Sequence, residues 1–330
     1  MIPVSVITGF LGSGKTTLLG RALRQPGFKR VAVIINEFGD IGIDHQLVES
    51  SDENFVQLTT GCLCCRVRSD LILTLHDLAA RRAEGSIMQF DRVVIETSGL
   101  ADPASILQAL MTDPAIAETY TLAGVVTMVD SVVGIETLDQ HRQSLRQAAA
   151  ADHLVITKTD LPQERTVETQ ARLAALNPAA TISVSRADGF DIAKLLEPIG
   201  SDPLSRLAEF PLPPDGPHTD DIISMSYQRD EPLHAATLAM FLEALAENCS
   251  SRLLRFKGIV HVKERPSNPA VVHGVQHVFH PPVWLEHWPS DDRRTRMVFI
   301  GASIPRTWII NLLNILDEEV AEETARWQAG

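Results

Sequence analysis

Residues 4–23 read VSVITGFLGSGKTTLLGRAL, and this stretch decides the fold. An apolar run leads into a turn that satisfies G-x-x-x-x-G-K-[ST] from Gly9 to Thr16, and a helical pattern follows the turn. Glycines let successive backbone N–H groups of such a turn point at phosphate oxygens, because no Cβ stands in the way. The N-terminus of the following helix favours the same anion through its dipole. The stretch therefore predicts a strand, a phosphate-binding loop and a helix, in that order.

The residue types in this loop predict a nucleoside triphosphate site. Lys15 is expected to bridge the β- and γ-phosphates, and the Thr16 hydroxyl is expected to bind Mg²⁺. The alternative, a glycine-rich turn with an exposed lysine, is disfavoured by the strand and helix patterns on either side. The residues predicted to bind the nucleotide here are Gly9, Gly12, Ser13, Gly14, Lys15, Thr16 and Thr17.

Strand and helix patterns alternate over the first two hundred residues. The strand candidates are apolar and show little polar alternation, as strands do when helices cover both faces of a sheet. They are Val4–Thr8, Val31–Ile35, Phe55–Leu58, Arg92–Glu96, Ala123–Val129, His153–Thr157 and Thr181–Val184. Helices are expected between them, for example at Thr16–Arg24, Asp70–Arg82, Ser105–Met111 and Glu164–Leu176. Repeated strand–helix units predict a doubly wound, mostly parallel α/β P-loop NTPase domain over residues 1–208.

A proline-rich stretch interrupts this alternation. Residues 210–221 read FPLPPDGPHTDD, which can continue neither a helix nor a central strand, so we expect a linker over 209–221. A smaller α+β domain is expected over 222–330. Its strands are predicted at Ile222–Tyr227, Leu253–Val262, Ala270–Phe279 and Thr295–Ile300, and its helices at Leu233–Glu247 and Pro305–Glu319. His273 and His277 would then share one face of a strand at about 13 Å, too far apart to bind one ion.

The composition argues against several classes of function. Lysine and arginine number 29 against 42 acidic residues, so the formal net charge is −13, and phosphate-rich nucleic acids or anionic membranes would be repelled. Hydrophobic residues make up 45%, which is typical of a globular protein and not of a disordered one. No apolar run approaches the ~20 residues needed to span a bilayer. We expect neither a nucleic-acid nor a membrane partner.

A carboxylate ends the strand predicted at Arg92–Glu96. P-loop enzymes need an acid at such a strand end to hold Mg²⁺, and Glu96 has that position. Its longer side chain could instead orient or deprotonate the attacking water, and an ordinary solvated glutamate is the remaining alternative. Gly99, three residues later, would let the backbone approach the γ-phosphate.

The residues that end and follow the strand predicted at His153–Thr157 indicate which base the nucleotide carries. Guanine presents N1–H and N2–H₂ donors, and one carboxylate can accept both. Asp160 fits that role, while the stem of Lys158 can lie along the ring, so the segment favours GTP over ATP. The usual first residue of this motif is Asn, and here it is Thr157.

Three of the four cysteines, Cys62, Cys64 and Cys65, fall within four residues. A disulfide framework spreads its cysteines along the chain, so this pattern favours a reducing cytoplasm and a thiolate metal site. Thiolates select Zn²⁺ or Cu⁺ over Mg²⁺, and three of them leave a fourth position open, which suits a carrier that must release its ion. Buried structural cysteines and a redox switch are the alternatives.

Together these motifs resemble the CobW/YjiA-like P-loop GTPases, metallochaperone relatives of the urease and hydrogenase nickel-insertion GTPases. The match is carried by GFLGSGKTTLL at 9–19, NEFGD at 36–40, GCLCC at 61–65, ETSGLADP at 96–103 and TKTD at 157–160, and in the C-terminal domain by LLRFKGIV at 253–260 and HGVQHVF at 273–279. The resemblance implies binding of GTP and Mg²⁺ and slow GTP hydrolysis. It also implies transport of Zn²⁺, or in some relatives Co²⁺ or Ni²⁺, on the three cysteines to client metalloproteins.

The resemblance also implies roles for individual residues and partners. Arg68 is expected near the nucleotide, and the acidic segment with Glu37 and Asp40 is expected to join Lys15 and Glu96 in catalysis. The client is expected to bind through the C-terminal domain, and a nucleotide- or metal-dependent dimer is expected as well. Two alternatives stay open: a GTP-regulated binding switch with redox-sensing cysteines and no metal delivery, and an ATPase.

Overall fold

The computed structural model describes residues 1–25, 28–36, 55–59, 67–159, 163–185, 195–196, 222–249 and 252–329. The chain forms two compact units. One comprises residues 1–174 and 180–199, and the other comprises residues 175–179 and 200–330. The predicted linker over 209–221 lies outside the described residues, and its bounds stay a prediction.

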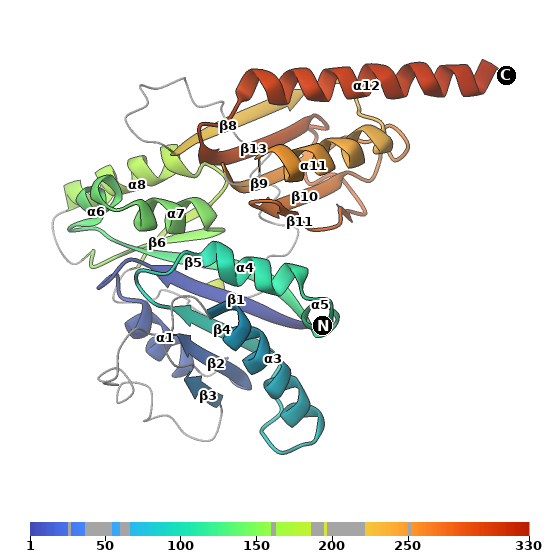
Figure 1. Cartoon of the computed structure of the whole chain (residues 1–330). Coiled ribbons are helices and arrows are strands. Elements are labelled where there is room, and N and C mark those ends of the chain that lie inside the picture. The colour runs from blue at the N-terminus through green and yellow to red at the C-terminus, as the bar shows by residue number, and fades with distance from the viewer. Residues whose placement is uncertain are drawn as a thin grey trace. The chain divides into compact units, whose positions relative to one another are not determined.

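Over the described residues, the first unit is built on a seven-stranded parallel sheet (Figure 1). Its strand order is β3-β2-β4-β1-β5-β6-β7. The strands are β1 (Ile2–Gly9), β2 (Val31–Asn36), β3 (Phe55–Thr59), β4 (Arg92–Thr97), β5 (Tyr120–Asp130), β6 (His153–Thr157) and β7 (Thr181–Val184). Every neighbouring pair is parallel. All seven strands therefore end at one edge of the sheet, and the predicted doubly wound α/β class is confirmed.

Helices cover both faces of this sheet. They are α1 (Lys15–Leu23), α3 (Val67–Ala83), α4 (Pro103–Thr112), α5 (Pro114–Thr119), α6 (Gly134–Gln140), α7 (Arg142–Ala150) and α8 (Gln163–Leu176). On one face, Leu18 and Leu19 of α1 pack into a buried cluster with Ile7 and Val33 of the strands. Helix α3 is hydrogen-bonded to the sheet, because the Tyr120 hydroxyl of β5 donates to the Leu75 carbonyl of α3 at 2.9 Å. Burial on both faces explains why these strands lack polar alternation.

Two helices that follow each other closely, α4 and α5, begin in the same way. Asp102 accepts a hydrogen bond from the Ala104 N–H at 3.0 Å, and Asp113 accepts one from the Ile116 N–H at 3.0 Å. A proline stands directly after each aspartate, at the first helical position. The repeated Asp-Pro dipeptide is thus a capping signal that predicts two short helices, where one had been expected.

In the second unit, the described part of the chain forms an antiparallel sheet and two long helices. The strand order is β11-β10-β9-β13-β8, and β12 pairs with β10. The elements are β8 (Ile222–Arg229), α11 (Ala235–Cys249), β9 (Leu253–Val260), β10 (Ala270–Val275), β11 (Val278–Phe279), β12 (Val283–Trp284), β13 (Thr295–Ala302) and α12 (Arg306–Ala329). This second, smaller domain was expected, although α12 runs past the predicted end at Glu319.

The single strand predicted over Ala270–Phe279 is wrong, because β10 and β11 form a hairpin. Val275 pairs with Val278, so Gln276 and His277 make the turn, and Gln276 has a positive φ of 55°. His277 therefore leaves the strand. The ring beside His273 is instead that of His280, with centroids 4.3 Å apart.

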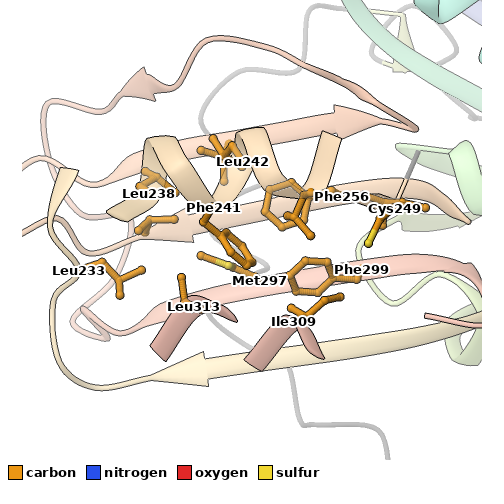
Figure 2. Packing of buried hydrophobic residues seen from close by; sticks show 14 of the residues in the cluster. Leu233, Leu238, Phe241, Leu242, Cys249, Phe256, Met297, Phe299, Ile309 and Leu313 are labelled. Carbon is orange, nitrogen blue, oxygen red and sulfur yellow. The ribbon is translucent and has the colours of Figure 1, made fainter. Parts of the chain in front are cut away.

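The core of the second unit lies between one face of its sheet and the two helices (Figure 2). The rings of Phe256 and Phe299 lie side by side on β9 and β13 with centroids 4.9 Å apart. Phe241 of α11 meets Phe299 edge to face at 6.4 Å. Leu313 of α12 belongs to the same buried cluster. The unit therefore has an aromatic core of its own.

Alternate residues of the same strands put charge on the opposite face. Arg255 pairs with Ile300 and Lys257 with Val298, so both lie on the face away from the phenylalanines. His280 lies near them, and burial together with the Arg255 charge lowers its pKa to about 4. The imidazole is therefore neutral in the folded protein at neutral pH.

This neutral histidine predicts a pH-dependent stability. The folded pKa lies below the unfolded value of about 6.5, so the unfolded chain binds the proton first as pH falls. Stability is lost between about pH 6.5 and 4. From pH 7 to 5, urea titrations should show wild type losing about 1 kcal/mol more than His280→Gln. Equal losses in the two proteins would refute this assignment.

Candidate functional site

The candidate site lies at the carboxyl edge of the parallel sheet, where four strand ends meet. The phosphate loop follows β1, Glu96 lies near the end of β4, Asp130 ends β5, and Thr157 ends β6. Register sets these segments beside one another, because Ile7 pairs with Glu96 and Asp130 pairs with Thr157. Crevices at this edge are where open α/β sheets bind ligands.

The phosphate loop has a backbone that only glycine permits. Gly9, Gly12 and Gly14 have φ values of 142°, 72° and 93°. A Cβ on Gly9 would lie 2.5 Å from the Met128 carbonyl oxygen, so the loop passes directly against β5. Gly14 caps α1 in the left-handed conformation, which leaves the first N–H groups of that helix for an anion.

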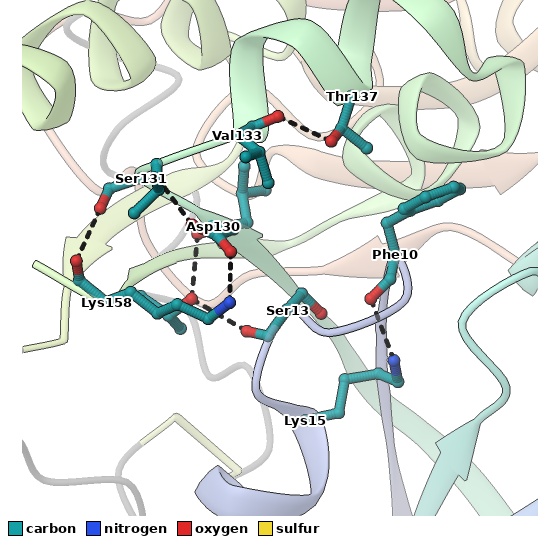
Figure 3. A network of polar contacts seen from close by, with 11 residues as sticks. Phe10, Ser13, Lys15, Asp130, Ser131, Val133, Thr137 and Lys158 are labelled. Carbon is teal, nitrogen blue, oxygen red and sulfur yellow. Dashed lines mark hydrogen bonds and ion pairs between the residues drawn. The ribbon is translucent and has the colours of Figure 1, made fainter.

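Lys15 is buried at the base of this loop. Its ammonium donates to the Gly9 carbonyl at 2.9 Å. It also donates to the Phe10 carbonyl at 3.2 Å, as Figure 3 shows. Both acceptors belong to the phosphate loop, so the ammonium of Lys15 is held against the backbone of its own loop. Thr17, in contrast, is exposed on the first turn of α1.

Thr16 and Glu96 lie 80 residues apart in two separate motifs, and the fold brings their side chains together. The Thr16 hydroxyl donates to Glu96 Oε1 at 2.7 Å, and the Glu96 side chain is fully buried. A hydroxyl beside a carboxylate is a set of hard oxygen donors, which Mg²⁺ prefers. The chemistry of these two side chains therefore fits the predicted Mg²⁺ site.

The segment after Glu96 packs against the phosphate loop. A Cβ on Gly99 would lie 2.7 Å from the Leu11 nitrogen, so only glycine fits there. Gln147 of α7 holds the segment by donating to the Gly99 carbonyl at 3.1 Å and to the Ala101 carbonyl at 3.0 Å. Gln147 was not anticipated, because a polar residue in a short helix carries no motif.

Two buried hydroxyls border the phosphate loop and the segment after β4. Within the part of the chain that the structure describes, Ser13 Oγ and Ser98 Oγ have no hydrogen-bond partner. Buried hydroxyls are usually satisfied, so their position at this edge is consistent with a polar ligand.

Residues 157–160, the base segment, are predicted to bind the base. The first of them, Thr157, connects this segment to the phosphate loop. The Thr157 hydroxyl donates to the Ser13 carbonyl at 2.9 Å and also lies 3.3 Å from the Val129 carbonyl. Threonine at this position therefore keeps a side-chain link to the loop. Lys158 follows with a positive φ of 56° and pairs with Asp130. Asp130 was missed by the sequence analysis.

Several predicted site residues lie outside the described residues. They are Glu37, Asp40, Cys62, Cys64, Cys65 and Asp160; Arg68 falls within α3, where only the backbone is described. Among the described residues, no group of three or more His, Cys, Asp or Glu could hold a metal ion, and no helix there is long and apolar enough to cross a membrane. Cys249 is buried, and burial raises the pKa of its thiol, which disfavours the thiolate form.

The chain is similar over nearly its whole length to zinc chaperones. It is 33% identical over 308 residues to the zinc chaperone YjiA of Escherichia coli, a match that covers 92% of this chain and 95% of that protein. It is 32% identical over 356 residues to the zinc chaperone CobW of Pseudomonas aeruginosa, covering 94% and 90% respectively. The crystal structure of Zn(II)-bound YjiA GTPase from E. coli matches with a TM-score of 0.72 at 28% identity, over 96% of this chain and 98% of that one.

The link between Thr157 and Ser13 predicts a binding defect. Thr157→Val keeps the shape but removes the hydroxyl, so GTP affinity should fall about tenfold, the effect of one lost hydrogen bond. Thr169→Val is the matched control, because the buried Thr169 hydroxyl has no partner among the described residues. Fluorescent GTP titration checks both variants. Unchanged affinity in Thr157→Val would show that the link is dispensable.

Two family models together span most of the sequence. The CobW/HypB/UreG nucleotide-binding domain matches residues 3–184, and the cobalamin synthesis protein cobW C-terminal domain matches residues 222–316. The first match coincides with the parallel sheet and its phosphate loop, and the second with the antiparallel sheet and its helices. The chain therefore belongs to the CobW family of P-loop GTPases.

Proposed function

We propose that this GTPase binds Zn²⁺ at Cys62, Cys64 and Cys65 and delivers it to client metalloproteins. Two relatives that match along nearly the whole chain are named zinc chaperones, and this supports the metal and the carrier role. The observation that carries the nucleotide part is the contact of Thr16 with Glu96 beside the buried Lys15. Co²⁺ or Ni²⁺ at the same thiolates, and client docking on the C-terminal domain, belong to the same proposal.

The proposed hydrolysis uses residues at the carboxyl edge of the sheet. Thr16 and Glu96 would hold Mg²⁺, which when bound would supply positive charge against the negative phosphates. Lys15 would move its ammonium from the loop carbonyls to the phosphate oxygens. Gly99 would give the γ-phosphate access to a backbone N–H. Arg68, Glu37 and Asp40 are proposed to complete this side of the site, and Asp160 with Lys158 to select guanine.

Sheet geometry supports coupling between metal and nucleotide. The cysteine segment starts just after β3, and Ile35 of β2 pairs with both Thr59 of β3 and Glu96 of β4. Neighbouring strands lie about 4.8 Å apart, so the end of β3 is only about 10 Å from the Glu96 backbone. Because the cysteine segment begins so close to Glu96, we propose that its conformation changes when the γ-phosphate is bound or lost. Any effect of GTP on Zn²⁺ affinity must be matched by an equal effect of Zn²⁺ on GTP affinity.

The role proposed for Glu96 predicts a separation of binding from hydrolysis. Glu96→Gln keeps the shape but removes the charge that attracts Mg²⁺ and water. GTP hydrolysis should fall about a hundredfold, while nucleotide affinity in the absence of Mg²⁺ should stay close to that of wild type. Phosphate release and nucleotide titration measure the two quantities. Hydrolysis at the wild-type rate would exclude Glu96 from catalysis.

The role proposed for the cysteines predicts independent loss of metal and nucleotide. The double variant Cys64→Ser, Cys65→Ser should lose tight Zn²⁺ binding and keep GTP binding, because serine does not supply a thiolate. Lys15→Ala should do the reverse. Cys249→Ala is the control for removing a thiol elsewhere, and its Zn²⁺ affinity should equal that of wild type.

Competition of Zn²⁺ against a chromophoric chelator, with GTP or GDP present, measures metal affinity and its coupling to nucleotide. Equal Zn²⁺ affinity in both nucleotide states would remove the coupling. Metal-free protein with a reversibly oxidised cysteine, purified without air, would favour the redox-sensing switch instead.

A further inference from the structure

Asp130 and Ser131, at the end of β5, form a short polar bracket that lies outside the phosphate loop, the cysteine segment and residues 157–160. Asp130 is the last residue of the strand and is buried. One of its oxygens, Oδ1, accepts from the Val132 N–H at 2.7 Å, which fixes the carboxylate. The other, Oδ2, accepts from the Lys158 ammonium at 2.5 Å (Figure 3).

The bracket holds the backbone of the base segment as well as its side chain. The Ser131 hydroxyl donates to the Lys158 carbonyl at 2.9 Å, and the Ser131 N–H donates to the Thr157 carbonyl at 3.0 Å. Lys158 has a φ of 56°, which a non-glycine residue adopts only where its surroundings enforce it. Two adjacent residues of the β5 end therefore fix the conformation of Lys158 from main chain to ammonium.

This arrangement differs from a surface ion pair. The Asp130 side chain is only 10% exposed, whereas that of Lys158 is 48% exposed. The carboxylate is thus an immobile anchor, and part of the lysine remains open to solvent. A lysine stem loses much rotamer freedom when it stacks on a flat ring, and an anchored ammonium removes that cost before the ligand arrives.

We propose that Asp130, supported by Ser131, is a positioning residue that orients Lys158 for the guanine base. The inference rests on the proposed base contact of Lys158 and goes beyond it by naming what makes that contact selective. Asp130 touches neither base nor phosphate in this role. It acts through Lys158, while the neighbouring Ser131 is connected through Thr157 to the Ser13 carbonyl of the phosphate loop.

The test compares a ligand that has a base with one that lacks it. Inorganic tripolyphosphate probes the phosphate loop alone, and GTP probes the loop and the base segment together. Asp130→Asn should weaken GTP about tenfold, the loss expected for one charge-assisted hydrogen bond, and leave tripolyphosphate affinity unchanged. Ser131→Ala is a milder second variant and should weaken GTP selectively by about threefold. Equal weakening of both ligands would show a merely structural role and overturn the proposal.

Asp152→Asn is the matched control in the full chain. Asp152 is buried and accepts from the Val125 N–H of β5 at 2.9 Å, but it precedes β6 and so lies at the opposite edge of the sheet. Its loss should lower stability without changing the ratio of GTP to tripolyphosphate affinity. A fall in that ratio equal to that of Asp130→Asn would overturn the proposal.

A double-mutant cycle separates this inference from the proposed function. If Asp130 acts through Lys158, then Asp130→Asn should have no further effect on GTP in a Lys158→Ala background. Additive effects would overturn the inference and leave the base contact intact. If Lys158→Ala itself binds GTP as wild type does, the base contact fails, and the inference fails with it.

Discussion

The phosphate loop runs so close to β5 that no side chain fits between them at Gly9. The Met128 carbonyl occupies the space that a Cβ would need, and Leu11 occupies the space beside Gly99 in the same way. These two approaches fix the loop between the ends of β4 and β5. The contacts of Lys15, Thr16 and Thr157 depend on that fixed position. Lys15 donates to carbonyls of the loop itself, whereas Thr16 and Thr157 each join two segments at the edge of the sheet.

The parallel sheet gives this arrangement its rigidity at low cost. Four of the strands, β1, β4, β5 and β6, each place one segment of the site at the same edge, and the register of the strands decides which segments are neighbours. Helices on both faces leave the strands dry, so a buried carboxylate such as Glu96 is tolerated only with a partner, and Thr16 is one. The second unit is built differently. Helices pack against one face of its antiparallel sheet to form an aromatic core, and the other face carries Arg255 and Lys257.

Much of the fold and part of the site could be predicted from the sequence. The phosphate loop could be recognised because backbone geometry requires its glycines and phosphate binding requires its lysine. The buried parallel strands could be recognised because they are mostly apolar. The hairpin at Gln276 was missed because neither turn residue is a usual turn former, although Gln276 takes a positive φ. Asp130 and Gln147 were missed because their roles depend on register and on helix packing, which bring residues distant in sequence together. At Thr157 the sequence departs from the usual asparagine, and the hydrogen bond of its hydroxyl to the Ser13 carbonyl depends on a contact between residues distant in sequence.

The placement of Cys249 gives the protein a built-in reporter of its own integrity. This sulfur is buried in the hydrophobic interior of the C-terminal unit, and burial raises the pKa of its thiol. An alkylating reagent added to the native chain therefore does not react with this thiol. The same reagent modifies it once that unit opens, so the mass added at this one position counts the molecules whose C-terminal unit has come apart.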